Sequence, residues 1–417
     1  MKKTKFIPGQ TYIPVSGKVF DREEINNAIA AARDGWWTEG RWAKQFEKEF
    51  KKFQKVKYVS LVNSGSSANL VALACLTSKV FGERRLKPGD EFITSPVAFP
   101  TTVNPGIIYG LKPVFIDAKL GTLNIDASKI EKAITKKTKL IMIAHTLGKP
   151  CDLDQITKLA KKYNLWLIED CCDALGSKYD RKLIGTYGDI ATFSFYPAHQ
   201  ITMGEGGAVV TNNLLIHRSI RQFRDWGREC WCDTGRDNTC GKRFKFQLGK
   251  LPQGYDHKYI YSQIGYNLKL TDFQAAIGVA QLKKLPSFIK KRKENYQKLF
   301  NFFRKYEKYF ILMKTTDKED PCWFGFPLVV REDAPFTRNQ LTTYLEKNKI
   351  GTRNIFSGNL LKHPAYQETK YKQIGKMINA DIILSSAFWI GVWPGINEKM
   401  LNYVKKIIKE FMAKNVV

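Results

Sequence analysis

Residues 189–212 read DIATFSFYPAHQITMGEGGAVVTN, two β-rich runs joined by a turn-forming segment that carries a single histidine. The runs DIATFSFY and GAVVTN have the apolar, β-branched and aromatic content that is typical of buried strands. The segment between them contains Pro197, His199 and a Gly-rich turn, and proline and glycine are the residues that most often mark a connection. This stretch therefore predicts two strands with His199 near the end of the first.

Runs of the same kind continue upstream and alternate with helical segments. Five strands are expected from about residue 58, in YVSLVN, EFITSP, KPVFID, KLIMIA and LWLIED, and two of the intervening helices in SSANLVALACLTSKVF and LDQITKLAKKYN. Strands that alternate with helices predict an α/β fold with a mainly parallel sheet covered on both faces. Ligands of such a sheet bind at the carboxyl ends of the strands.

The alternation stops at residues 228–258, which are rich in Gly, Asp and basic residues and have little periodicity. We expect a long insertion loop there, and long loops in compact domains are usually functional. A long helix should follow from about residue 270 and lead into a smaller C-terminal α+β domain. The predicted domains are a large cofactor-binding domain at residues 1–285, which includes the insertion loop, and a small domain at residues 286–417.

The composition indicates a globular protein with an excess of positive charge. The chain has 417 residues, 43% of them hydrophobic, and its 68 Lys and Arg against 39 Asp and Glu give a net charge of +29. This balance excludes a disordered or collagen-like chain. Because the basic residues are scattered, with no five-residue run of like charge, we expect no nucleic-acid partner. An anionic substrate or an acidic protein partner accounts for the charge equally well.

The N-terminal residues MKKTKFIPGQ are basic but lack the apolar segment of a signal peptide. The least polar late stretch, residues 382–393, is shorter than the roughly 20 apolar residues that cross a bilayer. We therefore expect a cytoplasmic protein without a membrane span.

Two motifs predict a phosphate-bearing ligand with a ring nitrogen. VNSGSSANLVAL, at residues 62–73, is a strand followed by a turn and a helix, and the free N–H groups of a helix start can bind phosphate through Gly65 and Ser66. Asp170 ends the strand LWLIED, where a carboxylate can keep a heterocyclic nitrogen protonated. Each motif alone fits a simple helix cap or turn equally well.

The cysteines form a third signal. Cys230, Cys232 and Cys240 lie in RECWCDTGRDNTCGKRF, and Cys172 lies two residues after Asp170. In a chain of this length such thiols more often bind metal than form a disulfide scaffold. Four thiolates suit either Zn²⁺ or an iron–sulfur cluster, and the spacing does not decide between them.

With these motifs in place, the sequence resembles the fold-type I, vitamin B6-dependent sugar aminotransferase superfamily. In that superfamily a strand ending in Ser-Phe leads to the lysine that binds the cofactor covalently, and a Gly-rich turn follows. Here His199 stands in that place, and no Lys occurs between Lys182 and Lys242. The resemblance therefore implies the deoxygenating branch of the superfamily, whose members hold pyridoxamine phosphate without a covalent bond and use the histidine as a base.

The resemblance extends from GWWTEGRWAKQFEKEF, at residues 35–50, to the C-terminal domain, and it implies roles for individual residues. Gly65, Ser66 and Ser194 would hold the cofactor phosphate, Asp170 would pair with the pyridine nitrogen, and Phe99 in SPVAFPTTVNP would stack near the ring. Asn267, in IGYNLKLTDFQAA, would reach the phosphate of the neighbouring subunit's cofactor, which implies a homodimer with shared active sites.

The cysteine pattern beside a histidine in place of lysine is similar to that of the cluster-containing 3-dehydrases of this branch. It implies a [2Fe–2S] cluster held by Cys172, Cys230, Cys232 and Cys240, with Cys171 as a competing ligand for Cys172. It also implies removal of the C3 hydroxyl from a CDP-linked 4-keto-6-deoxyhexose, with electrons from a separate NAD(P)H-dependent iron–sulfur flavin reductase.

Two alternatives stay open on the sequence. A cluster-free 3-dehydratase of the same branch, acting on another nucleotide-linked 4-keto-6-deoxyhexose, explains His199 but gives the four cysteines no role. A zinc-stapled binding protein explains the cysteines and leaves the phosphate turn and Asp170 without a function. An ordinary sugar aminotransferase would need the missing lysine.

Overall fold

The computed structural model describes residues 6–416, and its centre is an eight-stranded sheet with the order β1-β9-β8-β5-β4-β2-β3-β14. The strands are β1 (Tyr58–Val62), β2 (Glu91–Thr94), β3 (Lys112–Ile116), β4 (Thr138–Ala144), β5 (Trp166–Asp170), β8 (Ile190–Ser194), β9 (Gly207–Thr211) and β14 (Lys372–Ile374). β9 is antiparallel to both neighbours, β1 and β8, and the other neighbours pair in parallel. The predicted, mainly parallel α/β sheet is confirmed.

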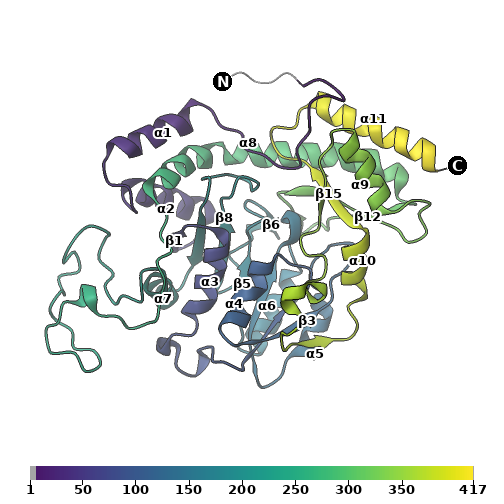
Figure 1. The fold of residues 1–417 in the computed structure, drawn as a ribbon. Helices are drawn as coiled ribbons and strands as arrows, with labels where there is room; N and C mark the ends of the chain where they lie inside the picture. The colour runs from purple at the N-terminus through teal and green to yellow at the C-terminus, as the bar shows by residue number, and fades with distance from the viewer. Residues whose placement is uncertain (1–5, 417) are drawn as a thin grey trace.

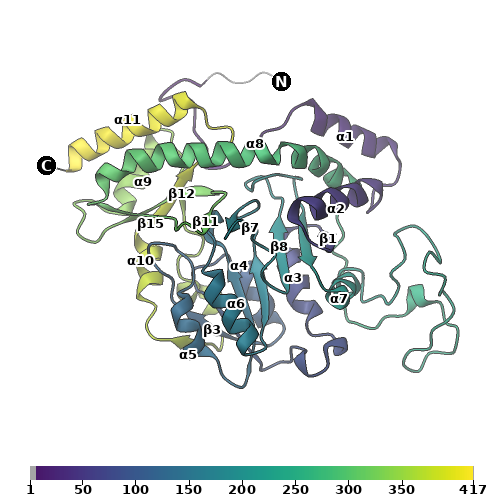
Figure 2. The same cartoon turned by 180° about the vertical axis from the view of Figure 1, so that it is seen from behind.

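Helices cover both faces of this sheet because the strands are apolar on both sides (Figures 1 and 2). Along β4, Ile141 and Ile143 pack into one core, and Leu140 and Met142 pack into the other. The first core contains side chains from α2 (Arg41–Gln54), α6 (Leu153–Lys162) and the start of α8 (Asp272–Phe303). The second contains side chains from α3 (Gly65–Cys75), α4 (Pro100–Ile108) and α7 (Leu214–Arg224).

A smaller four-stranded antiparallel sheet, with the order β10-β12-β15-β13, lies in the C-terminal part. Its strands are β10 (Phe310–Leu312), β12 (Gly325–Val330), β13 (Arg353–Asn354) and β15 (Ala387–Gly391), and it packs with α9 (Arg338–Lys347) and α11 (Glu398–Asn415). The N-terminal residues Phe6, Ile13 and Val15 belong to the same core. β13 and β15 are the elements of this sheet that reach the site described below.

One helix joins the two parts of the molecule. α8 runs from Asp272 to Phe303 without interruption, and Figure 1 shows it passing from beside α2 to beside α9 and α11. Its Leu285 and Phe288 pack into the core of the large sheet, whereas Tyr296 and Leu299 pack into the core of the small sheet. The domain boundary that the sequence predicts near residue 285 falls inside this helix and stays a prediction.

Residues 228–258 form an extended loop whose regular structure is confined to the start of a short turn, η4 (His257–Tyr259). Two bridges close its base, between Asp225 and Asn267 and between Arg228 and Tyr261. In Figures 1 and 2 the loop stands out from the body of the molecule beside α7. Within residues 6–416 we find no helix with the length and apolar content to span a membrane.

Candidate active site

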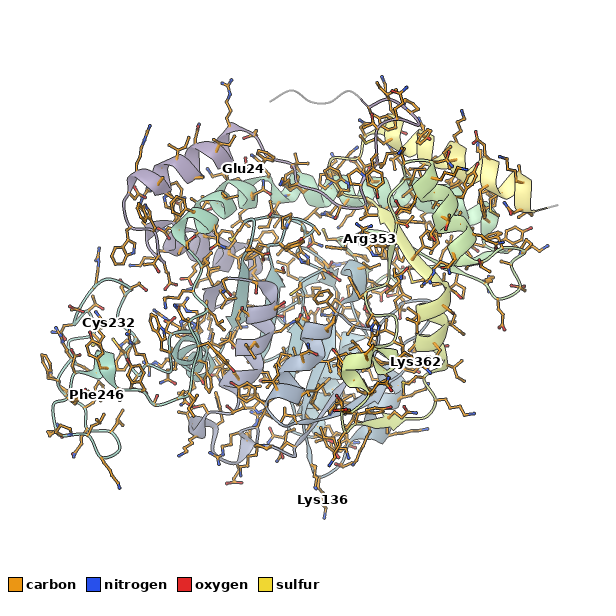
Figure 3. The ribbon with its side chains drawn as sticks, viewed as in Figure 1. Glu24, Lys136, Cys232, Phe246, Arg353 and Lys362 are labelled. Atoms are coloured by element: carbon orange, nitrogen blue, oxygen red, sulfur yellow. The ribbon has the colours of Figure 1, made fainter. Side chains whose placement is uncertain are left out.

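A cavity of about 720 Å³ opens between the carboxyl ends of the large-sheet strands and the small domain. The large domain supplies most of its wall, and Arg353, Asn354 and Trp389 of β13 and β15 close it from the other side. Figure 3 marks Arg353 at this junction. The large-domain residues that line it include Gly65, Ser66, Phe99, Asp170, Cys172, Asp173, Ser194 and His199.

One corner of the cavity is a cradle for a phosphate. Ser64 caps α3 by accepting a hydrogen bond from the Ser67 N–H at 3.1 Å, so the first-turn N–H groups of an eleven-residue helix face the cavity. A Cβ atom on Gly65 would lie 2.5 Å from Cβ and 2.8 Å from Oγ of Ser194. Only glycine leaves this space open, and the predicted phosphate residues Gly65, Ser66 and Ser194 do meet here. The cradle fits the phosphate of a vitamin B6 cofactor.

Asp170 lies at the floor of the cavity, and three donors fix its carboxylate. Its Oδ2 accepts from Asn69 Nδ2 at 2.8 Å and from Thr102 Oγ1 at 2.7 Å, and its Oδ1 accepts from the Cys172 N–H at 3.1 Å. Thr192 Oγ1 in turn donates to the Asn69 side chain at 2.6 Å. A carboxylate held in this way at the end of a strand fits a protonated ring nitrogen. The sequence reasoning missed Asn69, Thr102 and Thr192, because helix and strand positions do not reveal contacts between elements.

His199 lies in the cavity wall with an unused ring nitrogen. Within residues 6–416 its buried Nδ1 has no hydrogen-bond partner, and the nearest carboxylate oxygen, Asp173 Oδ1, is 3.7 Å away. The ring packs 5.2 Å from the ring of Phe324. Burial, and after it the charge of Arg292, lowers the pKa of His199 to about 3. The imidazole is therefore neutral at physiological pH, as a base must be.

Arg292 of α8 holds the backbone around His199. Its Nη2 donates to the His199 carbonyl at 2.9 Å, and its Nη1 donates to the carbonyls of Trp323 at 3.3 Å and Phe324 at 3.1 Å. The side chain is fully buried. An arginine inside a long helical segment gives no signal in a single sequence, so this contact was not predicted.

Phe99 and Asn267 stand differently toward the cavity. Phe99 lines it, is 53% exposed and packs perpendicular to Phe356 with 6.2 Å between the ring centroids. Asn267 is exposed, and its Oδ1 accepts from Lys269 Nζ at 2.8 Å. It is not among the residues that line the cavity of its own chain.

The cysteines fall into two places. Cys172 lines the cavity, with its Sγ 3.1 Å from the position that a Cβ on Gly65 would take, whereas its neighbour Cys171 is fully buried beside His145 and Glu169. Cys172 is therefore the one of the two whose sulfur is available in the cavity.

The other three cysteines lie in the loop 228–258, where Figure 3 labels Cys232. The ligand atoms of Cys230, Cys232 and His257 lie within 4.8 Å of one another, and Cys240 Sγ is 3.5 Å from His257 Nε2. Burial works to raise the pKa of Cys232, but hydrogen bonds from Thr239, His257 and Cys240 lower it to about 6. These thiols have the chemistry of a metal centre.

The structure thus brings together three of the four predicted thiols, leaves Cys172 in the cavity, and adds His257. The sequence reasoning did not select His257, although it is the one histidine of the loop. The physical reason is that the loop packs on itself, with the His257 ring stacked on Phe246 at 5.5 Å and next to Trp231 at 5.6 Å.

Comparisons with known proteins identify the family to which this sequence is similar. The sequence profile of the DegT/DnrJ/EryC1/StrS aminotransferase family matches residues 18–409. The lipopolysaccharide biosynthesis protein RfbH of Salmonella typhimurium is 52% identical over 410 residues, which cover 98% of this chain and 94% of that protein. A dTDP-4-dehydro-2,6-dideoxy-D-glucose 3-dehydratase of Saccharopolyspora spinosa is 48% identical over 410 residues, covering 98% of this chain and 88% of that protein.

Among solved structures, the E. coli GDP-4-keto-6-deoxy-D-mannose-3-dehydratase with bound hydrated PLP superposes with a TM-score of 0.85 and 29% sequence identity. The superposition covers 95% of this chain and all of that chain. The fold of this protein is therefore that of the vitamin B6-dependent aminotransferases, as the sequence predicted.

Proposed function

The chain belongs to the DegT/DnrJ/EryC1/StrS aminotransferase family, and from that premise we propose that it is a CDP-6-deoxy-4-hexulose 3-dehydrase. It would remove the C3 hydroxyl from CDP-4-keto-6-deoxy-D-glucose on the route to 3,6-dideoxyhexoses of a surface polysaccharide. The observation that carries the proposal is His199, which stands where a covalent lysine would, in a cavity whose phosphate cradle and ring-nitrogen partner are otherwise complete.

Pyridoxamine phosphate fits this cavity without a covalent bond. Gly65, Ser66 and Ser194 would hold its phosphate, and Asp170, fixed by Asn69 and Thr102, would keep its ring nitrogen protonated. When bound, the cofactor supplies an amine for the C4 ketone of the sugar and a ring that accepts electrons.

His199 is the general base of the proposed reaction. With the cofactor and sugar bound, its neutral ring would accept a proton and would be able to return it to the departing C3 hydroxyl. Asp173 lies 3.7 Å from Nδ1, and burial, followed by the charge of Asp170, raises its pKa to about 8. A protonated Asp173 therefore lies beside the imidazole without drawing it into an ion pair.

Replacing His199 by lysine tests this assignment. We expect His199→Lys to bind the cofactor covalently, with the shifted visible absorption of a Schiff base, and to lose the dehydration activity. His199→Asn is the matched variant that removes the base without adding an amine, so it should lose dehydration and keep a dissociable cofactor. Wild-type dehydration rates in either variant would contradict the assignment.

We further propose a [2Fe–2S] cluster and a separate NAD(P)H-dependent iron–sulfur flavin reductase. Dehydration alone leaves the sugar two electrons short of the 3-deoxy product, and a cluster passes electrons singly from such a reductase. The structural support for the cluster is that Cys230, Cys232 and Cys240 lie close together in the loop 228–258. For the proposed homodimer, the support is that Asn267 is exposed and does not line the cavity of its own chain, so it is free to reach a second subunit.

The cluster has its own test. Protein purified without oxygen should contain about two irons and two acid-labile sulfides per chain, with visible bands that dithionite bleaches. Cys230→Ser should lose the iron and the reduced product while dehydration continues, and Cys151→Ser, at a buried cysteine away from the loop, should keep both. One zinc per chain and no sulfide would contradict the cluster.

A cluster-free 3-dehydratase is the second candidate, because one observation favours it. Cys172 does not lie with the three loop thiols in the described part of a single chain. In that case the loop cysteines would hold zinc, and the cofactor would be regenerated from an amino acid. The iron and sulfide analysis separates the two candidates.

A further inference from the structure

The three loop thiols are held at a distance from Cys172 of their own chain. Lys44 Nζ lies 2.8 Å from Asp233 Oδ2, and Thr234 Oγ1 donates to Glu39 Oε2 at 2.9 Å, so two polar contacts tie the segment next to Cys232 to the region that begins α2. Cys230 lines a groove formed by Tyr58 and α7. The loop is therefore anchored along the outer edge of the large sheet.

Strand geometry places Cys172 elsewhere. Tyr58 begins β1, and the carboxyl end of that strand, four residues later, is about 13 Å away at 3.3 Å per residue. Cys172 follows the carboxyl end of β5, three strand positions from β1, or about 14 Å at 4.8 Å per position. The groove that contains Cys230 thus begins at the amino end of β1, whereas Cys172 lies at the carboxyl edge of the sheet. β1 is also three strand positions away from β5.

The base of the loop points to a different source of the fourth thiol. Asn267 pairs with Asp225 in the bridge that closes this base. The next bridge joins Tyr261 to Arg228, which lies two residues before Cys230. If Asn267 reaches the cofactor phosphate of a second subunit, the loop whose base it closes lies on the side of the chain that faces that subunit. Cys172 adjoins the phosphate cradle, because its Sγ lies next to Gly65.

Exposed apolar side chains surround the same base. Ile264 is 94% exposed, Tyr261 55%, Tyr259 51% and Trp226 40%. An exposed patch of large apolar side chains marks an interaction site. This apolar patch is continuous with Asn267, the residue assigned to the subunit contact. A second copy of this chain is therefore the partner that would cover it.

We propose that the [2Fe–2S] cluster is built across the dimer, with Cys230, Cys232 and Cys240 from one subunit and Cys172 of the partner subunit. This inference rests on the proposed cluster and homodimer. His257 Nε2, close to Cys232 Sγ and Cys240 Sγ, keeps the loop thiols together within one chain, and the partner subunit's Cys172 completes four thiolates. Each dimer then holds two clusters, and neither forms within a single chain.

Two mixed dimers test this arrangement, both isolated with a different affinity tag on each chain and without oxygen. The first pairs a Cys172→Ser chain with a chain carrying Cys230→Ser, Cys232→Ser and Cys240→Ser. A cluster built across the dimer predicts one complete site here, with half the wild-type iron and sulfide per dimer and a paramagnetic signal after reduction. Both parent homodimers should contain less than about one tenth of the wild-type iron.

The second mixed dimer pairs a wild-type chain with a chain that carries all four substitutions. It holds the same set of cysteines as the first, and a cluster built across the dimer predicts no complete site in it. A cluster built within one chain predicts the reverse: half the wild-type iron in the second dimer and none in the first. That reversed pattern would overturn the inference.

Further measurements separate failure of this inference from failure of the function on which it rests. Size-exclusion chromatography and cofactor absorption establish that every preparation is a folded, cofactor-binding dimer, and a monomeric wild type would overturn the inference. Wild-type dimers without iron or sulfide would remove the cluster and the inference together. Dehydration in the absence of reductase, which needs no cluster, would still report whether the proposed dehydrase activity stands.

Discussion

Asp173 lies between two influences that oppose its ionisation. Its carboxyl group lies in the wall of the cavity with 17% of the side chain exposed, and the charged Asp170 lies near it in the same turn. Burial, and then the charge of Asp170, raises its pKa to about 8, whereas an unfolded chain has the ordinary value of 3.8. The unfolded state therefore loses this proton at a lower pH than the folded state does.

We predict that Asp173→Asn stabilises the cofactor-free protein at neutral pH. Above pH 4 the unfolded wild type gains from ionising this group and the folded protein does not, so the wild type loses stability as the pH rises toward 8. One pKa unit corresponds to about 1.4 kcal/mol, so the variant should unfold with a free energy on the order of 3 to 4 kcal/mol higher at pH 7. Below pH 4 the difference should vanish.

Denaturant unfolding between pH 4 and pH 8 measures this effect. Asp317→Asn, at an exposed aspartate, is the matched control and should change stability by less than about 0.5 kcal/mol at any pH. The same Asp173→Asn variant should dehydrate more slowly, since it changes the cavity wall beside His199. A variant that is equally stable at pH 4 and pH 7 relative to wild type would show that Asp173 ionises normally.

Single residues were predictable where they break a pattern. Asp170 was found because it ends β5 within a recognisable motif, and His199 because it stands in the place of the cofactor lysine five residues after β8. Asn69, Thr102, Asp173 and Arg292 act through contacts between elements that lie far apart in the chain. Nothing in their local sequence distinguishes them from ordinary helix and turn residues.

At the scale of an element, α8 supports the site through one side chain. Arg292 donates to the carbonyls of His199, Trp323 and Phe324. It thereby joins the segment after β8 to the segment before β12. We predict that Arg292→Met leaves these buried acceptors without donors and lowers the free energy of unfolding by about 3 kcal/mol or more. Dehydration should slow as well, because the backbone that carries His199 is released.

Chemical denaturation and cofactor titration of the same preparations test this prediction. Lys290→Met is the matched control, because it removes an exposed charge from the same helix and should change stability by less than about 0.5 kcal/mol. Equal stability of the two variants would show that the Arg292 hydrogen bonds contribute nothing beyond surface charge.

Whole elements were predicted well because strands buried on both faces leave a strong local signal. The runs YVSLVN, KLIMIA and LWLIED correspond to β1, β4 and β5, and the helix that begins near residue 270 corresponds to α8. The antiparallel direction of β9 was not predictable, since an apolar run is the same in either direction. Neither was β14, three residues of the C-terminal part that pair with β3.

At the scale of the whole molecule, the net charge of +29 predicts how a reductase would bind. Positive charges spread over a surface attract an acidic partner over distances of about 10 Å, and salt screens that attraction. We predict that the reductase-coupled rate falls severalfold between 50 and 300 mM NaCl at saturating substrate. Dehydration without reductase is the internal control and should change by less than twofold. Coupled rates that do not depend on salt would exclude an electrostatic encounter.

The unbroken course of α8 also has a mechanical meaning. A hinge between two lobes needs a flexible connection, and here the connection is a 32-residue rod whose two ends are embedded in different cores. Pro286 lies inside this helix near the point where it passes from one core to the other, so the lobes could swing apart only by bending the helix there. We therefore expect the width of the opening between the lobes to change, if it changes at all, by a small bend at Pro286 and not by free rotation about a flexible linker.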